Sequence, residues 1–244
     1  MKFENNNFIK YFFVILIILI IQQLFSKIGG IIANLFNYQN IDPQNVFAFI
    51  TIHHIVILII SLLLIYILKK LYNIDFGFRL GNFKKGLKYL AIFTIVIFIY
   101  TLLYQLIGYY FKIATPINYP LNIKNVLGTL GFQLFLSGTA EELLFRALPI
   151  SILLFTFRRS KSFKWGITIE TIIAAVLFSL AHIQWSFSPF VINMNFYQLI
   201  YSFILGIAYG LVYQKSDSII YPILMHSISN VLYVGVGYIF TILF

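Results

Sequence analysis

Long apolar runs separated by short polar connections dominate the chain. Seven apolar segments lie at about residues 9–26, 47–68, 89–111, 125–157, 168–186, 196–213 and 219–243. A helix needs about 20 mostly apolar residues to cross a bilayer, and each segment is close to that length or longer. The pattern predicts an all-α, polytopic integral membrane bundle of about seven transmembrane helices, or eight if one segment is split or re-entrant.

The fourth segment, 125–157, is longer than a bilayer requires and contains Pro149. We expect it to bend or to project into the cytoplasm. Because a proline has no N–H to donate to the carbonyl of Phe145, the backbone would open beside the charged residues that precede it. The plainer alternative is a simple kink.

Basic residues predict the orientation of the bundle. The N-terminus and the second, fourth and sixth connections carry Lys2, Lys10, Lys69, Lys70, Arg79, Lys84, Lys85, Lys88, Arg158, Arg159, Lys161, Lys164 and Lys215. The other connections carry Lys27, Lys112 and Lys124. Since cytoplasmic loops hold an excess of Lys and Arg, we expect a cytoplasmic N-terminus and a multi-pass protein of the plasma membrane.

Composition agrees with this class. The chain has 244 residues, 61% of them hydrophobic and 10% charged, which excludes an ordinary soluble domain. The formal net charge of +10 is spread between the apolar runs rather than gathered in one patch, so we expect no nucleic-acid partner. The absence of cysteine excludes disulfides, thiolate chemistry and Cys-ligated zinc.

Three ionisable side chains, Glu141, Glu142 and Arg146, interrupt the fourth apolar segment. Each charge at the centre of a spanning helix costs roughly 2.5 to 3.5 kcal/mol, so these residues need partners. On a helix Glu142 and Arg146 are four residues apart and can pair. Glu141 points about 100° away from Glu142, so its partner must come from another helix.

Two later segments carry polar side chains at helical spacing. Phe178 and His182 lie one turn apart in the fifth segment, and His226 and Asn230 lie one turn apart in the seventh. Because lipid cannot accept these polar groups, we expect them to face a common interior with Glu141. The alternative for each polar residue is a hydrogen bond that joins two helices.

These residue types suit hydrolysis by an activated water. A buried carboxylate beside an imidazole can take a proton from water, which assigns that role to Glu141 and His182. His226 and Asn230 supply two donors for the oxyanion that amide hydrolysis creates. The supporting residues are Glu142, Arg146 and Phe178.

The segment boundaries leave a tension in this assignment. At 1.5 Å per residue, His182 would lie about 21 Å deep and His226 about 10 Å deep, so the two helix starts must shift for these residues to meet. We expect a water-filled cavity in the cytoplasmic half of the bilayer or near its midplane.

The sequence gives weaker support to other chemistries. Zinc could be held by Glu141, His182 and His226, but the His-Glu-x-x-His motif is absent, and we expect no metal or other cofactor. The candidate serine nucleophiles lack an elbow motif or a His partner at an obvious spacing; they are Ser137, Ser179, Ser227 and Ser229. His53 and His54 are adjacent and point in different directions, so a packing or cavity role is favoured. Gly206 and Gly210 favour internal helix packing over a dimer face.

The three motifs together resemble the CPBP family of intramembrane proteases. They are Glu-Glu-x-x-x-Arg at Glu141 to Arg146, Phe-x-x-x-His at Phe178 to His182, and His-x-x-x-Asn at His226 to Asn230. This family includes the CAAX prenyl endopeptidases and the bacterial Abi proteins of bacteriocin processing or immunity. The resemblance implies a glutamate-dependent, metal-independent endopeptidase with the residue roles given above. It divides the single membrane domain, 1–244, into N-terminal spans at 1–123 and a motif-bearing catalytic core at 124–244.

The expected substrate is a membrane-associated peptide or protein at the lipid bilayer, and bacteriocin or peptide-pheromone processing or self-immunity is the biological role that the small size favours. The main alternative is a non-catalytic immunity or binding protein of the same fold. A proton-coupled transporter would carry inverted repeats, which the sequence does not display. The substrate, the prenylation state and the oligomeric state do not follow from the sequence.

Overall fold

The computed structural model describes residues 5–112, 117–158, 161–187 and 190–244. Lys2 and Arg159, two of the residues behind the predicted orientation, lie outside these ranges. The described helices are α1 (Asn5–Ala33), α2 (Ala48–Tyr72), α3 (Phe83–Tyr110), α4 (Ile123–Phe132), α5 (Gly138–Glu142), α6 (Leu148–Phe157), α7 (Ile169–Leu180), α8 (Phe196–Ser216) and α9 (Ile220–Leu243), with a short 3₁₀ turn at Lys164–Gly166. The predicted helical bundle is confirmed.

Five of the described helices are long and apolar enough to cross a membrane: α1, α2, α3, α8 and α9. The chain is therefore described as a multi-pass helical bundle. The number of seven spans and the cytoplasmic N-terminus stay predictions.

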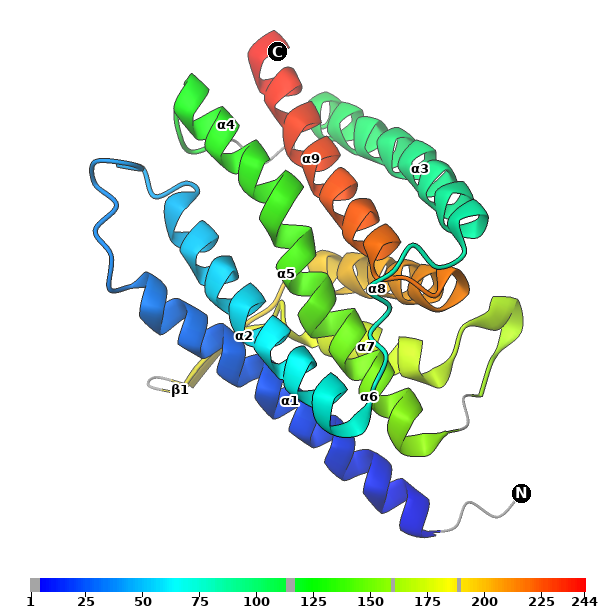
Figure 1. Cartoon of the computed structure of the whole chain (residues 1–244). Helices are drawn as coiled ribbons and strands as arrows, with labels where there is room; N and C mark the ends of the chain where they lie inside the picture. The colour runs from blue at the N-terminus through cyan, green and yellow to red at the C-terminus, as the bar shows by residue number, and fades with distance from the viewer. Residues whose placement is uncertain (1–4, 113–116, 159–160, 188–189) are drawn as a thin grey trace.

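Helices α4, α5 and α6 form one continuous helix, which we call the central helix (Figure 1). Two π-helical turns, Gln133–Ser137 and Leu143–Ala147, join its three parts and lie on either side of the Glu141–Glu142 pair. The second turn directly precedes Pro149. There the N–H of Leu148 bonds to the carbonyl of Leu143, five residues back, so a wider turn accommodates the donor that the proline lacks.

The central helix packs between two others. Figure 1 shows α2 along one side of it and α9 along the other, and α5 contacts both. Gly138 allows the close approach to α9, because a Cβ atom at that position would lie 2.8 Å from Oγ of Ser227. The acidic pair is thus brought between α2 and α9 at the centre of the bundle.

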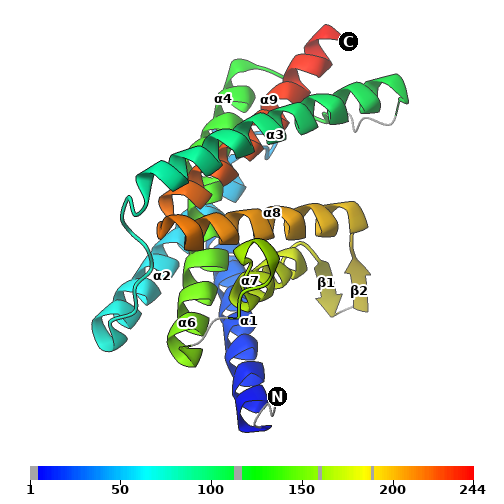
Figure 2. The same ribbon diagram turned by 90° about the vertical axis from the view of Figure 1, so that its right-hand side faces the viewer.

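Helices α7 and α8 pack closely against each other, and in Figure 2 α8 runs across the direction of α1 and α6. Two glycines of α8 make this contact. A Cβ atom on Gly206 would lie 2.9 Å from Cβ of Ala175, and one on Gly210 would lie 2.9 Å from Cγ2 of Thr171. Both glycines therefore serve internal helix packing, as predicted.

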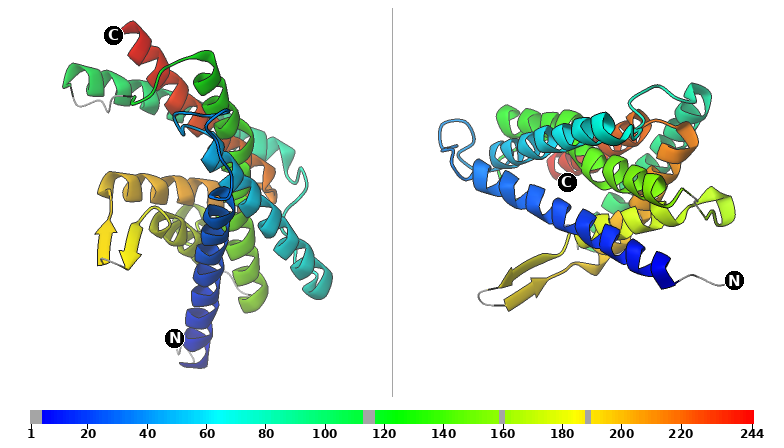
Figure 3. Two further views of the ribbon diagram at one scale, coloured as in Figure 1. Left: turned by 90° about the vertical axis from the view of Figure 1, so that its left-hand side faces the viewer. Right: turned by 60° about the horizontal axis from the view of Figure 1, so that its bottom comes forward.

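The fifth apolar segment is shorter than predicted. Helix α7 ends at Leu180 instead of continuing to residue 186, and its 12 residues extend only about 18 Å. An antiparallel hairpin follows, formed by β1 (Gln184–Phe187) and β2 (Phe190–Asn193), with Trp185 opposite Ile192 (Figure 3). Apolar β-branched and aromatic residues suit a strand as well as a helix, which explains the error in the predicted boundary.

The N-terminus of α2 is fixed by the buried side chain of Asp42. Its carboxylate accepts hydrogen bonds from the backbone N–H groups of Val46 (2.9 Å), Phe47 (2.7 Å) and Ala48 (2.7 Å). These are donors that the helix itself leaves unpaired at its start. Asp42 therefore sets where α2 begins.

Candidate active site

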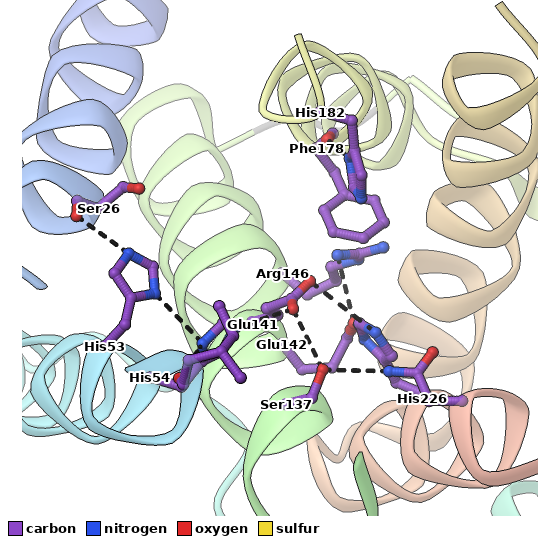
Figure 4. A network of polar contacts seen from close by, with 12 residues as sticks. Ser26, His53, His54, Ser137, Glu141, Glu142, Arg146, Phe178, His182 and His226 are labelled. Carbon is purple, nitrogen blue, oxygen red and sulfur yellow. Dashed lines mark hydrogen bonds and ion pairs between the residues drawn. The ribbon is translucent and has the colours of Figure 1, made fainter. Parts of the chain in front are cut away.

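Glu141, on α5, has two carboxylate oxygens in different surroundings. Oε1 lies 3.1 Å from Nε2 of His54 and accepts a 3.2 Å hydrogen bond from Oγ of Ser137. Oε2 instead faces His226, whose Nε2 atom is 3.9 Å away. One oxygen is thus held on both sides, and the other is directed toward the ring of His226 on α9 (Figure 4).

Glu142 is completely buried and joins two cationic or ionisable partners. Its Oε1 atom accepts a 2.7 Å hydrogen bond from Nδ1 of His226 and lies 3.2 Å from Nη1 of Arg146. The predicted pairing of Glu142 with Arg146 is therefore present. Because Nδ1 of His226 donates to Glu142, its Nε2 atom is the nitrogen left for chemistry.

Arg146 has no solvent exposure and lies against two aromatic rings. Its guanidinium carbon is 3.9 Å from the ring centroid of Phe178 and 5.2 Å from that of Tyr209. Aromatic faces attract a cation, and this attraction is stronger when the pair is removed from water. Phe178 and Glu142 together stabilise the buried charge of Arg146.

His182 lies in the turn directly after α7, one turn beyond Phe178. Its Nδ1 atom donates a 2.9 Å hydrogen bond to the carbonyl oxygen of Phe178. The ring of Phe178 lies between the two histidines, with its centroid 4.8 Å from that of His182 and 6.0 Å from that of His226. Within the described residues His182 forms no hydrogen bond with Glu141, and its Nε2 atom has no anchoring partner.

Asn230 lies one turn after His226 on α9. Its amide Nδ2 donates a 3.1 Å hydrogen bond to Oγ of Ser137, which in turn donates to Glu141. An amide nitrogen carries two hydrogens, so one of them is engaged with Ser137. Asn230 is thereby linked to the carboxylate of Glu141 through a single hydroxyl.

One cavity of about 290 Å³ collects these groups. Its lining includes His54, Ser137, Glu141, Phe178, His182, His226 and Asn230. The predicted tension in depth between His182 and His226 is resolved because the helices do not run parallel: α7 and α8 cross the direction of the central helix and α9, so residue counts from the helix starts do not measure a common depth.

The zinc ligands considered as an alternative are Glu141, His182 and His226. Across the described ranges, no three His, Cys, Asp or Glu side chains are grouped closely enough to hold a metal ion. Nδ1 of His182 and Nδ1 of His226 donate to a carbonyl and to Glu142, so the Nε2 atom is the nitrogen of each ring that remains for other contacts. The expectation that the protein uses no metal or other cofactor stays a prediction.

The sequence predicted a packing or cavity role for His53 and His54, with the two rings pointing in different directions, and His54 indeed lines the cavity while His53 faces Ser26. What the sequence did not predict is the contact of His54 with the Glu141 carboxylate. Ser137 was considered only as a nucleophile and instead bridges Glu141 and Asn230. The only sequence signal for His54 was a polar residue in an otherwise apolar span.

Residues 123–232 match the family described as type II CAAX prenyl endopeptidase Rce1-like. Comparison with curated proteins and with solved structures gave no significant match. The matched region contains all three sequence motifs and the whole central helix. The resemblance indicated by the motifs is confirmed: residues 123–232 are similar to the family of Rce1-like type II CAAX prenyl endopeptidases.

Proposed function

We propose that this protein is an intramembrane glutamic-type endopeptidase that hydrolyses a peptide bond of a membrane-associated peptide or protein. The observation that carries the proposal is the arrangement of Glu141, with Oε1 held by two partners and Oε2 directed toward His226 in a cavity that His182 also lines. The family match supports a protease at the general level. The division of labour below goes beyond that match.

Glu141 is proposed as the general base. A water in the cavity donates one hydrogen to Oε2 of Glu141 and its second hydrogen to Nε2 of His182, which accepts because Nδ1 of that ring carries the proton. Both contacts orient the water's lone pair toward a bound substrate carbonyl. A positioned base of this kind contributes about 10² to 10⁴ in rate.

His226 and Asn230 are proposed to stabilise the oxyanion. The second N–H of the Asn230 amide remains for a substrate oxygen once the first is engaged by Ser137. Nε2 of His226 can donate only when the ring is protonated, because Nδ1–H already bonds to Glu142. Glu142 holds the ring of His226 in place while Glu141 acts on the water, which gives the acidic pair two separate tasks.

The chemical step then balances without a further reactant. Glu141 takes a proton from water as the water oxygen bonds to the carbonyl carbon, and the carbonyl oxygen becomes the oxyanion. The protonated Glu141 next gives its proton to the amide nitrogen, and the carbon–nitrogen bond breaks. The products are a carboxylic acid and an amine, and the carboxylate of Glu141 is restored. The proposal assigns no metal ion to this step.

The surroundings of the cavity favour a substrate with apolar character. A larger hollow of about 680 Å³ between α3 and α9 shares Tyr233 and Val234 with the cavity and is lined mainly by aromatic and apolar side chains. Apolar residues next to the cleaved bond would find space there. A bacteriocin or peptide pheromone of the plasma membrane is the substrate class we propose to test first, beside prenylated peptides.

The test is peptide cleavage by the purified protein in liposomes. Wild type, Glu141→Gln and His182→Ala are compared against peptides with and without a farnesyl group, each with and without a chelator. Asp217→Asn is the matched control, because this carboxylate is exposed at the surface beside Arg79. We expect cleavage by wild type and the control, a loss of at least about 100-fold in both site variants, and no effect of the chelator.

Three results would contradict the proposal. Loss of cleavage with chelator and its return with added zinc would establish a metal enzyme. Equal activity in wild type and Glu141→Gln would remove the carboxylate from the mechanism. If wild type cleaves nothing while the site variants keep a protective phenotype in cells, the non-catalytic immunity protein is the better description.

A further inference from the structure

His54 of α2 lies at the cavity wall and is not one of the residues in the three motifs. Its side chain is nearly buried, and its ring packs edge-on against Phe132 at a centroid distance of 4.9 Å. Nε2 is 3.1 Å from Oε1 of Glu141, across a gap of 87 residues in the sequence. This is a direct contact between α2 and the proposed general base.

The other nitrogen of His54 fixes the tautomer of the ring. Nδ1 lies 2.9 Å from the carbonyl oxygen of Ile50, which can only accept, so Nδ1 carries a hydrogen. Nδ1 of His53 is 3.2 Å away, and Nε2 of His53 lies 3.1 Å from the carbonyl oxygen of Ser26. His53 therefore carries its hydrogen on Nε2 and can accept from His54 through Nδ1.

This pattern leaves one arrangement for the contact with Glu141. With hydrogen on Nδ1, a neutral His54 has a bare Nε2 atom that cannot donate. A hydrogen bond to Oε1 of the Glu141 carboxylate therefore requires a second hydrogen on the ring of His54, at Nε2. Oε1 is then occupied by His54 and by Ser137, and Oε2 is the oxygen that remains for the water.

The remaining charged and titratable groups near His54 do not compete for this contact. Glu142 on the central helix pairs with Arg146 and with His226. The ring of His226 approaches the other oxygen of Glu141, at 3.9 Å. From α1, Ser26 reaches His53 through its carbonyl oxygen, and Gly29 packs against the same ring.

We propose that His54 is a positioning residue that anchors Oε1 of Glu141 and so presents Oε2 to the substrate water. The role rests on the proposed function, since it acts through the general base. The His53 ring, held by the carbonyl of Ser26 on α1, presents its bare Nδ1 atom as an acceptor to Nδ1–H of His54 and so helps to fix the orientation of the anchoring ring. A cavity role was considered for this histidine pair from the sequence, and the contacts give it a specific task.

Kinetics on the full-length protein in liposomes test the anchor. His54→Leu is expected to lower kcat by about 10- to 100-fold with KM unchanged, as loss of a supporting partner does. His54→Gln keeps a side-chain N–H that can reach Oε1, and it should recover most of kcat. Unchanged kcat in His54→Leu, or an equal fall in His54→Gln, would overturn the proposal while leaving the cleavage activity itself established.

A measurement that does not depend on cleavage separates this proposal from the proposed function. The chain has four histidines, so ring ¹⁵N NMR signals can be assigned by single substitution in histidine-labelled protein. We expect Glu141→Gln to shift the Nε2 signal of His54, and Asp217→Asn to leave it in place. An unmoved His54 signal in Glu141→Gln would overturn the anchor, whether or not a substrate has been found.

Discussion

Nδ1 of His226 and Nη1 of Arg146 converge on a single oxygen of Glu142, at 2.7 Å and 3.2 Å. Glu142 is therefore the counter-ion of a buried arginine and the orienting partner of a histidine at the same time. Its neighbour Glu141 faces the cavity, with a side chain that is 21% exposed, while Glu142 has no exposure. Adjacent acids on one helix thus differ completely in their surroundings, and single substitutions should separate their effects.

Removal of Glu142 should unfold the protein more readily. Glu142→Leu leaves the buried guanidinium of Arg146 without an acid, which costs about 3 to 5 kcal/mol of unfolding free energy. The double variant Glu142→Leu, Arg146→Met removes both charges and should lose much less stability. Denaturant unfolding in detergent measures both, and a double variant as unstable as the single one would contradict this account.

Ser137→Ala should lower kcat without abolishing cleavage. The substitution removes the hydroxyl that joins Asn230 to Oε1 of Glu141, but it leaves His54 on that oxygen. We expect a fall of about 10-fold, at the lower end of the range for supporting groups. Complete loss of activity, together with an acylated Ser137 in wild type, would instead indicate a serine nucleophile.

Gly206→Ala and Gly131→Ala form a matched pair of substitutions. A Cβ atom on Gly206 would lie 2.9 Å from Cβ of Ala175, whereas one on Gly131 would meet nothing within 4 Å. Overpacking at Gly206 should cost about 1 to 3 kcal/mol, and Gly131→Ala should be neutral or stabilising because alanine favours a helix. Melting temperatures in detergent distinguish the two, and equal shifts would contradict the close packing of α7 against α8.

Acid should weaken the start of α2 through Asp42. Burial raises the pKa of its carboxyl, but the hydrogen bonds from the backbone N–H groups of Ala48, Val46 and Phe47 outweigh burial and leave the pKa below its ordinary value. The stabilisation is therefore complete above the unfolded pKa of about 4 and is lost as pH falls through the lower folded value.

Asp42→Ala should accordingly lower the unfolding free energy by about 0.5 to 2 kcal/mol at pH 7, as the loss of a helix cap does. The difference between wild type and variant should shrink as the solution is acidified below pH 4, since the protonated carboxyl no longer stabilises the backbone donors. Thermal unfolding at a series of pH values measures this difference. A difference that stays constant with pH would contradict the role of the charge.

Local spacing explains which parts of the site could be predicted. The pairing of Glu142 with Arg146 follows from their spacing of four residues on one helix, and the same spacing places His226 and Asn230 on one face of α9. The contact of His54 with Glu141 depends on how α2 lies against the central helix, and nothing in the spacing of an apolar span specifies that direction. The role of Ser137 could not be predicted from spacing either, because it depends on a hydrogen bond with a residue of α9.

The fold was also predictable only in part. Long continuous apolar runs predicted the helices, because a spanning helix needs such a run. It failed at the end of α7, where the apolar residues of the hairpin continue the run past Leu180. Hydropathy measures the transfer of side chains from water, and it does not separate a helix from a strand when both are rich in apolar residues.

The two π-helical turns make the central helix equivalent to a regular helix that has received one additional residue on each side of its acidic pair. A wide turn absorbs such a residue locally, so the segments before and after it keep the faces they would have had. The side on which α4 and α6 make their packing contacts is therefore independent of the side on which α5 carries its two acids. The orientation of Glu141 and Glu142 can differ from the phase of the flanking segments, while the hydrophobic contacts of those segments remain in place.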